Sequence, residues 1–284
     1  MSHSSERTLE QPRAVIVIPT YNERENLELV LRRVLEALPD GHVLFVDDNS
    51  PDGTGELADS FAESDPRHVS VLHRPGKQGL GAAYVAGYKH ALNSWPDVPF
   101  FIQMDADLSH DPQYLPGMLD AAQDADVVVA SRYTRGVSIV NWPLHRLIVS
   151  RFGTTFARLV TRLPLTDCTS GFKCYRAEVL RALGLDAIRS NGYVFQIETS
   201  FRAWRMGFRM KELPIIFYER QAGESKLHLN IAFEALCVVL RLGLERLLDG
   251  CRPSVSACST PARPRRAQKS SAGDGDGGEG AERG

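Results

Sequence analysis

Short apolar runs alternate with segments of helical periodicity over the first half of the chain. Five runs rich in β-branched and other apolar residues predict buried strands, at residues 14–18, 43–46, 69–73, 100–104 and 127–130. The segments between them predict helices, at residues 24–38, 54–63, 80–92 and after Pro112. Continuous apolar strands separated by helices are typical of a mostly parallel sheet covered on both faces, so we predict a Rossmann-like α/β fold.

Four of the predicted strands run directly into polar clusters. These clusters are residues 19–23, 47–50, 105–107 and 131–133. In parallel sheets, ligands bind at the carboxyl ends of the strands. We therefore expect the four clusters to meet along one edge of the sheet and to form a site.

Composition and charge narrow the class of protein. The chain has 284 residues, is 43% hydrophobic and carries a formal net charge of −2, which fits a globular α/β domain without a pull toward nucleic acid. No nucleic-acid-binding motif is present, so we expect no nucleic-acid partner. The five cysteines are spread out without a CxxC pair, which favours reduced thiols in a cytosolic setting.

The ends of the chain differ in composition from its centre. Residues 1–13 are polar without an apolar signal segment and predict a flexible N-terminus. Residues 251–284 are rich in Gly, Ser, Pro, Ala and charge, and predict a disordered tail. A single α/β domain is therefore expected at residues 14–250. Within it, the apolar stretch 231–248 is interrupted by charged residues, which favours an amphipathic helix over a membrane span.

Two carboxylates, Asp105 and Asp107, directly follow the predicted strand at residues 100–104. Hard oxygen ligands of this kind suit Mg²⁺ or Mn²⁺, which proteins hold with few carboxylates plus phosphate oxygens. Glu23 and Asp48, at two neighbouring strand ends, offer acceptors for ribose hydroxyls and base N–H groups. The combination predicts a site for a nucleoside diphosphate sugar and its cation.

Each pattern has a simpler structural explanation when it is taken alone. An Asp-x-Asp pair can form a turn or a cap, and residues 47–53 can form a tight turn before an N-cap at Thr54. Glu23 can complement the first turn of the next helix, and the glycines at residues 76–81 can be ordinary loop residues. The occurrence of all of them at successive strand ends favours the functional interpretation.

Further along the chain, residues 220–226 place Arg220 and Lys226 on either side of a glycine. This arrangement suits a loop that closes over phosphates, although a solvated surface turn has the same composition. Arg132 adds a third cation for phosphate groups. A second segment, residues 167–172 (DCTSGF), has a sequence that a simple connection does not require.

Seven segments carry recognisable motifs: PTYNERENL (19–27), VDDNSPDGT (46–54), GLGAAYVAG (79–87), MDADLSHDP (104–112), SRY (131–133), GYVFQIE (192–198) and GESKL (223–227). They resemble the family-2 glycosyltransferases with the GT-A nucleotide-diphospho-sugar fold. Within that family they are similar to the dolichol- or polyprenol-phosphate mannose synthases, to which the fourth segment and the last two are specific. The resemblance covers residues 14–226, about three quarters of the chain.

The resemblance implies roles for individual residues. It places GDP-mannose against Pro19, Tyr21, Glu23, Val46, Asp48, Asp105, Ala106, Asp107, Arg132, Arg220 and Lys226. Asp107 is implied to be the direct metal ligand with Asp105 beside it, and Asp107, Arg132, Arg220 and Lys226 carry the catalytic roles. Some relatives have a metal-binding Gln at the position of Ser109, where the shorter hydroxyl weakens such a contribution. Asn49 replaces a Gly of relatives, which a left-handed turn tolerates.

The reaction implied is the transfer of mannose from GDP-mannose to a polyprenyl phosphate. Such an acceptor is already anionic near neutral pH, so it needs positioning and charge compensation in place of a general base. We therefore expect no catalytic base. In-line attack inverts the sugar and gives polyprenyl-phosphate β-mannose and GDP.

A lipid acceptor directs attention to amphipathic segments. Residues 133–163 contain five arginines and no acidic residue, and apolar side chains from Leu144 to Leu163 fall on one helical arc. This pattern predicts an interfacial helix near residues 140–163, although a core helix with its arginines in water has the same pattern. Residues 229–248 predict a second such helix. We expect peripheral association with the cytoplasmic face of the membrane, directly or through a membrane partner subunit such as some relatives require.

Two alternatives remain open at this stage. A UDP-sugar-dependent polyprenyl-phosphate hexosyltransferase has the same motifs, but such relatives usually carry two C-terminal spans. A non-catalytic nucleotide-sugar-binding subunit usually loses the metal carboxylates or the loop at residues 223–227, and this chain has both. A dinucleotide-dependent dehydrogenase is excluded because no GxGxxG opens the first strand–helix turn.

Overall fold

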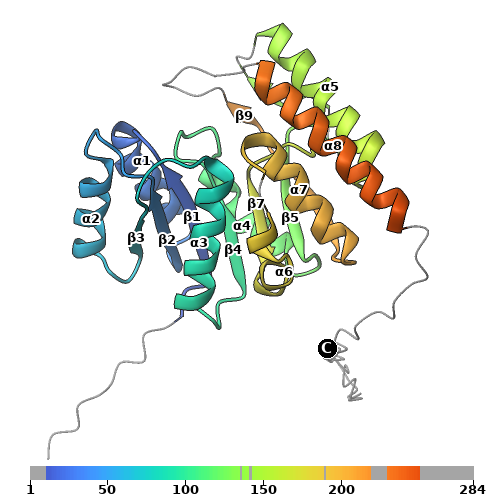
Figure 1. Cartoon of the computed structure of the whole chain (residues 1–284). Coiled ribbons are helices and arrows are strands. Elements are labelled where there is room, and N and C mark those ends of the chain that lie inside the picture. Colours follow the sequence, from blue (N-terminus) through green and yellow to red (C-terminus); the bar gives the residue numbers. More distant parts are fainter. Residues whose placement is uncertain (1–10, 135, 141–142, 189, 219–228, 250–284) are drawn as a thin grey trace, which may run out of the picture.

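The computed structural model describes residues 11–134, 136–140, 143–188, 190–218 and 229–249 (Figure 1). The predicted disordered tail at 251–284 lies outside the described residues, and so does most of the predicted flexible N-terminus at 1–13. The predicted phosphate loop at residues 220–226 lies outside them as well.

The central sheet has seven strands in the order β3-β2-β1-β4-β7-β5-β8. Their bounds are β1 (Ala14–Thr20), β2 (Gly41–Asp47), β3 (Val69–His73), β4 (Phe100–Gln103), β5 (Val127–Ser131), β7 (Lys173–Arg176) and β8 (Met210–Pro214). Every neighbouring pair is parallel except the two pairs that β7 makes with β4 and β5. The prediction of a mostly parallel sheet is confirmed, whereas the sequence pattern does not predict the antiparallel β7 in its centre. A separate parallel pair joins β6 (Ile139–Val140) to β9 (Phe217–Tyr218).

Helices cover both faces of the sheet, as the alternating pattern predicts (Figure 1). One face packs against α1 (Arg24–Ala37), α2 (Thr54–Ser64), η1 (Pro112–Tyr114) and α4 (Leu115–Ala121). The other packs against α3 (Leu80–Ser94), α6 (Ala177–Ala182), η2 (Leu185–Ala187) and α7 (Gly192–Arg205). Each face buries its own apolar cluster, because strands that are apolar on both sides must be covered on both sides.

Two further helices, α5 (Leu144–Thr161) and α8 (Leu229–Asp249), lie side by side at one end of the molecule and next to α7 (Figure 1). Ala157 of α5 and Val239 and Leu242 of α8 are buried in the cluster that α3 and α7 cover. Leu163, predicted to lie on the exposed arc of α5, is instead buried, because α5 ends at Thr161 and the chain turns into the core. Among the described residues, no helix combines the length and apolarity needed to cross a lipid bilayer.

A buried polar network accompanies the central antiparallel strand. Lys173 of β7 has no exposed surface, and its Nζ lies 2.7 Å from the Gln196 carbonyl oxygen and 2.9 Å from Ser200 Oγ of α7. Gln196 Oε1 accepts a hydrogen bond from Gln103 of β4, and Gln103 in turn accepts one from the Tyr88 hydroxyl of α3. Burial lowers the pKa of Lys173 from 10.5 to about 7. The network thus fixes α7 against β4 and β7 with directional bonds.

We expect Lys173→Met to change how stability depends on pH. The folded-state pKa lies below the unfolded value, so the folded protein releases this proton first, and Lys173 opposes folding most strongly below pH 7. Between pH 7 and 10, the free energy of unfolding of the wild type should rise relative to Lys173→Met by up to about 4 kcal/mol. Urea titrations across this range, with Lys211→Met as a surface-lysine control, measure the difference. A difference independent of pH would contradict the assignment.

Candidate active site

The carboxyl ends of β1, β2, β4 and β5 lie at one edge of the sheet. β1, β2 and β4 are mutually parallel, and β5 shares their direction because β4 and β5 are both antiparallel to β7. The expectation that the four polar clusters meet at one edge is therefore confirmed. Since β7 starts at this edge, the segment before it, residues 167–172, is also delivered there.

At the β2 end, the two adjacent aspartates have different partners. Asp47 is buried and accepts hydrogen bonds from Thr20 Oγ1 at 3.0 Å and from Ser50 Oγ at 2.6 Å, which ties the loops after β1 and β2 together. Asp48 forms an ion pair with Arg74, which follows β3 and also donates to Gln78 Oε1 at 3.1 Å. Burial raises the pKa of Asp48, and Arg74 offsets part of that rise. Asp48 is thus oriented by a cation that the sequence patterns did not single out.

The loop after β1 supplies the other predicted contacts of the nucleoside. Pro19 is the residue before the last one of β1, and Tyr21 has Lys77 Nζ over its ring at 3.8 Å from the ring centre. Glu23 receives a hydrogen bond from Asn26 Nδ2 at 2.8 Å, so its carboxylate lies over the start of α1. Lys77 is a cation of this loop cluster that the sequence reasoning missed.

Three local details of the edge follow from the side chains involved. Val46, predicted to line the nucleoside pocket, has no exposed surface and packs in the core, so only its main chain faces that edge. Ala106 is likewise buried and can meet a diphosphate only through its main chain. Asn49 has φ of 58°, which confirms the left-handed turn expected where relatives have glycine.

Asp105 is positioned by groups on three sides. The Tyr84 hydroxyl of α3 donates to Asp105 Oδ1 at 2.7 Å, and the Asp105 N–H donates to His110 Nδ1 at 3.0 Å. Burial, together with the Asp105 charge, raises the pKa of Tyr84, which keeps this hydroxyl a donor. Gly171 of the 167–172 segment lies beside these groups, since a Cβ placed there would be in van der Waals contact with Asp105 Oδ2 at 3.7 Å and with His110 at 3.4 Å.

Asp107 is held by its own loop. Asp107 Oδ1 accepts hydrogen bonds from the Ser109 N–H at 3.1 Å and from Ser109 Oγ at 2.6 Å. Leu108 between them has φ of 61°, a left-handed conformation that lets the loop fold back on the carboxylate. In this structure the Ser109 hydroxyl therefore orients Asp107.

Arg132 and Asp167 form a buried ion pair where β5 ends. Arg132 Nε and Nη2 each lie 2.7 Å from an oxygen of Asp167, and Nη2 also donates to Thr169 Oγ1 at 2.8 Å. Asp167 has no exposed surface, and Arg132 is 5% exposed. Burial alone raises the pKa of Asp167, but the Arg132 charge reverses this and lowers the pKa below its ordinary value. Both groups are thus charged, and Asp167 explains the unusual sequence of residues 167–172.

Glu212 of β8 holds the same segment from the other side. Its Oε1 accepts a hydrogen bond from the Asp167 N–H at 2.9 Å, and its Oε2 accepts one from the Thr166 N–H at 2.9 Å. Helix α5 is attached here too, since Thr154 Oγ1 accepts a hydrogen bond from the Cys168 N–H at 2.8 Å. The segment therefore connects the Arg132 site, the Asp105 site and α5.

The predicted cations Arg220 and Lys226 lie outside the described residues, so their relation to this edge stays a prediction. Among the residues that the structure describes, no group of three or more His, Cys, Asp or Glu side chains is arranged to hold a metal ion. A site of two carboxylates remains compatible with a cation whose other ligands are phosphate oxygens and water.

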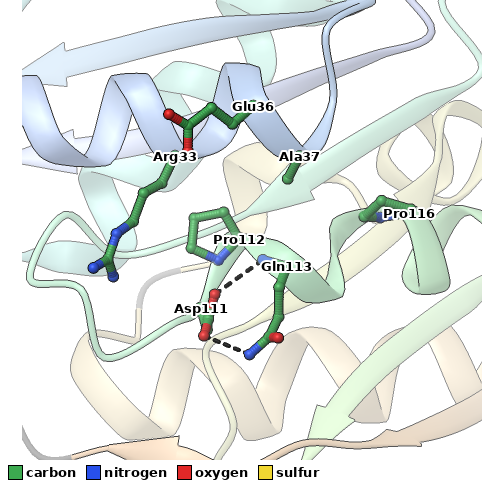
Figure 2. A pocket seen from close by; sticks show the side chains of 7 residues that line it. All are labelled: Arg33, Glu36, Ala37, Asp111, Pro112, Gln113 and Pro116. Carbon is green, nitrogen blue, oxygen red and sulfur yellow. Dashed lines mark hydrogen bonds between the residues drawn. The ribbon is translucent and has the colours of Figure 1, made fainter.

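A groove of about 430 Å³ lies elsewhere, between α1 and η1 (Figure 2). Its lining includes Arg33 and Glu36 of α1 and, opposite them, Asp111, Pro112 and Gln113. None of the residues predicted for the site lines it. The Asp111–Gln113 hydrogen bonds drawn in Figure 2 belong to the start of η1, where Asp111 acts as the N-cap.

Comparisons with known proteins identify the family and the fold. Residues 15–184 match the family described as glycosyl transferase family 2. An undecaprenyl-phosphate mannosyltransferase of Micrococcus luteus is 48% identical over 84% of this chain and 98% of that protein. A polyprenol monophosphomannose synthase of Mycolicibacterium smegmatis is 45% identical over 84% of this chain and 90% of that protein.

Solved structures share the fold at lower identity. A Pyrobaculum calidifontis mannosyltransferase in complex with GDP-Man and Mn²⁺ has a TM-score of 0.54 and 19% identity, over 84% of this chain and 65% of that one. A Mycobacterium tuberculosis glucosyl-3-phosphoglycerate synthase with Mn²⁺, UDP and phosphoglyceric acid has a TM-score of 0.60 and 16% identity, over 82% and 79%. The predicted GT-A fold is confirmed.

Asp167→Asn should destabilise the protein strongly. The substitution leaves the Arg132 guanidinium buried beside a neutral amide, and removal of one partner of a buried ion pair costs about 3–5 kcal/mol. Urea unfolding measures the loss. Asp59→Asn is the matched control, because its partner His73 is half exposed and such a pair contributes about 1 kcal/mol or less. Equal losses in the two variants would show that Asp167 is not a structural anchor.

Proposed function

The chain belongs to glycosyl transferase family 2, and from this premise we propose that it transfers mannose from GDP-mannose to a polyprenyl phosphate. One observation carries the proposal: Asp48, Asp105, Asp107 and the Arg132–Asp167 pair all lie at the carboxyl edge of one sheet. The relatives named for this acceptor class align over 84% of the chain. Support for GDP-mannose as the donor comes from Asp48 and Glu23, whose carboxylates suit the guanine base.

The donor's nucleoside lies, in this proposal, against the loops after β1 and β2. Guanine presents N–H groups, for which Asp48 and Glu23 offer carboxylate acceptors. Arg74 holds one oxygen of Asp48, so the carboxylate has a fixed orientation when the nucleotide arrives. Lys77, from the loop after β3, lies over the Tyr21 ring and adds a cation for the diphosphate. A uracil edge in a UDP-sugar offers fewer donors to these carboxylates.

Asp105 and Asp107 would hold a divalent cation, Mg²⁺ or Mn²⁺, together with the diphosphate. Their donor set fits such an ion, since two hard carboxylates at a strand end leave the remaining positions to phosphate oxygens and water. Bound there, the ion supplies neutralisation of the negative charge that develops on the departing diphosphate. The protein's own contribution is to fix the two carboxylates, by Tyr84 at Asp105 and by Ser109 at Asp107.

The acceptor phosphate attacks as an anion, so the site requires no general base. An oxygen of the polyprenyl phosphate forms a bond to the anomeric carbon while the bond from that carbon to GDP breaks. GDP leaves with the bonding electrons, and in-line displacement turns α-linked donor into β-linked product. No proton has to be moved in this step.

Two anions must therefore be brought together, which requires compensating charge. The Arg132 charge is neutralised by Asp167, so Arg132 adds no net positive charge to the site. We assign it the role of positioning residues 167–172 through its hydrogen bonds. Net positive charge for donor and acceptor phosphates is assigned to Lys77, Arg220 and Lys226.

Because the acceptor is a lipid, the protein needs a surface that contacts the membrane, and we assign this surface to α5 and α8. Both helices expose large apolar side chains: Leu144, Ile148, Val149, Phe152 and Leu159 on α5, and Leu236, Leu240, Leu244, Leu247 and Leu248 on α8. A face of this extent is unusual on a soluble protein and is typical of an interaction surface. Arginines beside it on α5 suit anionic head groups. We propose peripheral binding to lipid, and the free thiols Cys168, Cys174 and Cys237 favour the cytoplasmic face.

The position of α5 links this surface to the chemistry. Tyr133 directly follows Arg132, its hydroxyl lies 2.9 Å from Ser150 Oγ of α5, and Arg151 lies over its ring at 4.8 Å. A polyprenyl chain that lies in the membrane beneath α5 and α8 would thus present its phosphate close to the carboxyl edge of the sheet.

Radiolabelled donors test the function. Purified protein incubated with polyprenyl phosphate and Mg²⁺ or Mn²⁺ should move label from GDP-mannose, and not from UDP-glucose, into the organic phase. Asp107→Asn should reduce this transfer by at least about 100-fold while the fold stays intact, because the cation that would balance the diphosphate charge loses a carboxylate ligand. Asp111→Asn, on the same loop, is the matched control and should transfer normally. Labelling from UDP-glucose alone, or full activity of Asp107→Asn, would contradict the proposal.

Vesicle co-sedimentation tests the membrane surface. Phe152→Ser combined with Leu240→Ser should lower affinity for phosphatidylglycerol-containing vesicles at least about tenfold. The double variant loses the free energy that is gained when these two large apolar side chains move from water into the lipid. Met206→Ser, which removes a comparably exposed side chain at the end of α7, should have little effect. A wild-type protein that stays in the supernatant at low salt would count against direct binding and favour a membrane partner subunit.

A further inference from the structure

A buried carboxylate connects α7 to the lipid-facing α8. Glu198 of α7 is 1% exposed at its side chain, and its Oε1 lies 2.9 Å from Arg202 Nε and 2.7 Å from Arg202 Nη2. The same oxygen lies 3.5 Å from Nη2 of Arg241, which belongs to α8. Arg241 is half exposed and is shared with Glu245 of its own helix, also at 3.5 Å. α8 therefore meets a fixed negative charge within α7.

The other oxygen of Glu198 holds the chain just before α7. Ser190 Oγ donates to Glu198 Oε2, which fixes residues 190–191. These residues lie directly on the start of α3: a Cβ at Gly81 would be 2.3 Å from the Ser190 carbonyl oxygen, and a Cβ at Gly79 would be 2.6 Å from Asn191 Oδ1. Only glycine allows so close a contact, so the position of residues 190–191 and that of the first turn of α3 are coupled.

The start of α3 is joined in turn to both carboxylate groups of the donor site. Gln78 accepts a hydrogen bond from Arg74, the partner of Asp48. One turn into α3, Tyr84 donates to Asp105 and stacks on Phe195 of α7, with ring centres 5.9 Å apart and planes 6° from parallel. A shift of α7 against α3 would therefore change the surroundings of Asp48 and Asp105 together.

We propose that Glu198 is a positioning residue that couples the lipid-facing helix α8 to the donor-binding edge. When α8 lies on a membrane, Arg241 is held against Glu198, and residues 190–191 are held on the start of α3 in the arrangement that binds GDP-mannose. The 3.5 Å separation of Arg241 and Glu198 is longer than the 2.7–2.9 Å typical of charge-assisted hydrogen bonds, so the contact has room to shorten. This inference rests on the proposed function and adds to it a lipid-dependent donor affinity.

Coupling of this kind is reciprocal, which makes it measurable without turnover. With no polyprenyl phosphate present, saturating phosphatidylglycerol vesicles should lower the Kd for GDP-mannose by about fivefold or more. GDP-mannose should raise the affinity for vesicles by the same factor. In Arg241→Gln both factors should fall to about one, while the Kd for GDP-mannose in the absence of vesicles stays within about twofold of wild type.

Two control variants and one kinetic measurement distinguish the outcomes. Arg241→Lys should restore part of the coupling, and Glu245→Gln, which removes the other partner of Arg241, should retain it. With saturating donor and a detergent-dispersed acceptor, Arg241→Gln should keep the wild-type kcat. A coupling factor of one in the wild type, or an unchanged factor in Arg241→Gln, overturns the inference while mannosyl transfer stands. A wild type that binds no GDP-mannose in either condition overturns the proposed function and the inference with it.

Discussion

A guanidinium and a carboxylate, buried together where β5 ends and residues 167–172 approach β7, determine the arrangement of the active edge. The Arg132–Asp167 pair carries no net charge, and its main effect is geometric. The side-chain ion pair and the hydrogen bond from the Arg132 N–H to Asp167 together fix the position of residues 167–172. A buried ion pair is weak evidence for net stability. Its role here is to place Thr169 and Gly171 between the Arg132 site and Asp105.

The same logic explains why so many polar groups occupy the core. Apolar contacts hold helices on a sheet but tolerate small shifts, whereas hydrogen bonds in a low-dielectric interior permit few alternatives. Lys173, Gln196 and Gln103 link β7, α7 and β4, and Tyr84 links α3 to Asp105. The metal and diphosphate site proposed for this edge would require carboxylates placed to within a fraction of an ångström, and these bonds restrict the positions of the surrounding elements.

Two surfaces of opposite character are joined by this scaffold. The sheet edge gathers the charged groups proposed to bind the nucleotide, and α5 with α8 exposes the apolar side chains proposed to contact lipid. Thr154 and Ser150 attach α5 to the chain around Arg132, and Glu198 attaches α8 to the chain that packs on α3. The protein thus brings a water-soluble donor and a lipid acceptor together without a spanning helix among the residues described.

The sequence by itself determined the helices and strands, such as β1, α3 and α5, because these depend on residues that are close in the chain. It also determined that polar clusters follow β1, β2, β4 and β5 and so lie at one edge of the sheet. Only the tertiary structure decided the partners. Arg74 for Asp48, Tyr84 for Asp105 and Asp167 for Arg132 come from 26, 21 and 35 residues away. The short, polar β7 and the burial of Leu163 were likewise beyond local patterns. Periodicity reports which face of an element is apolar, whereas pairing depends on contacts that form when distant segments pack.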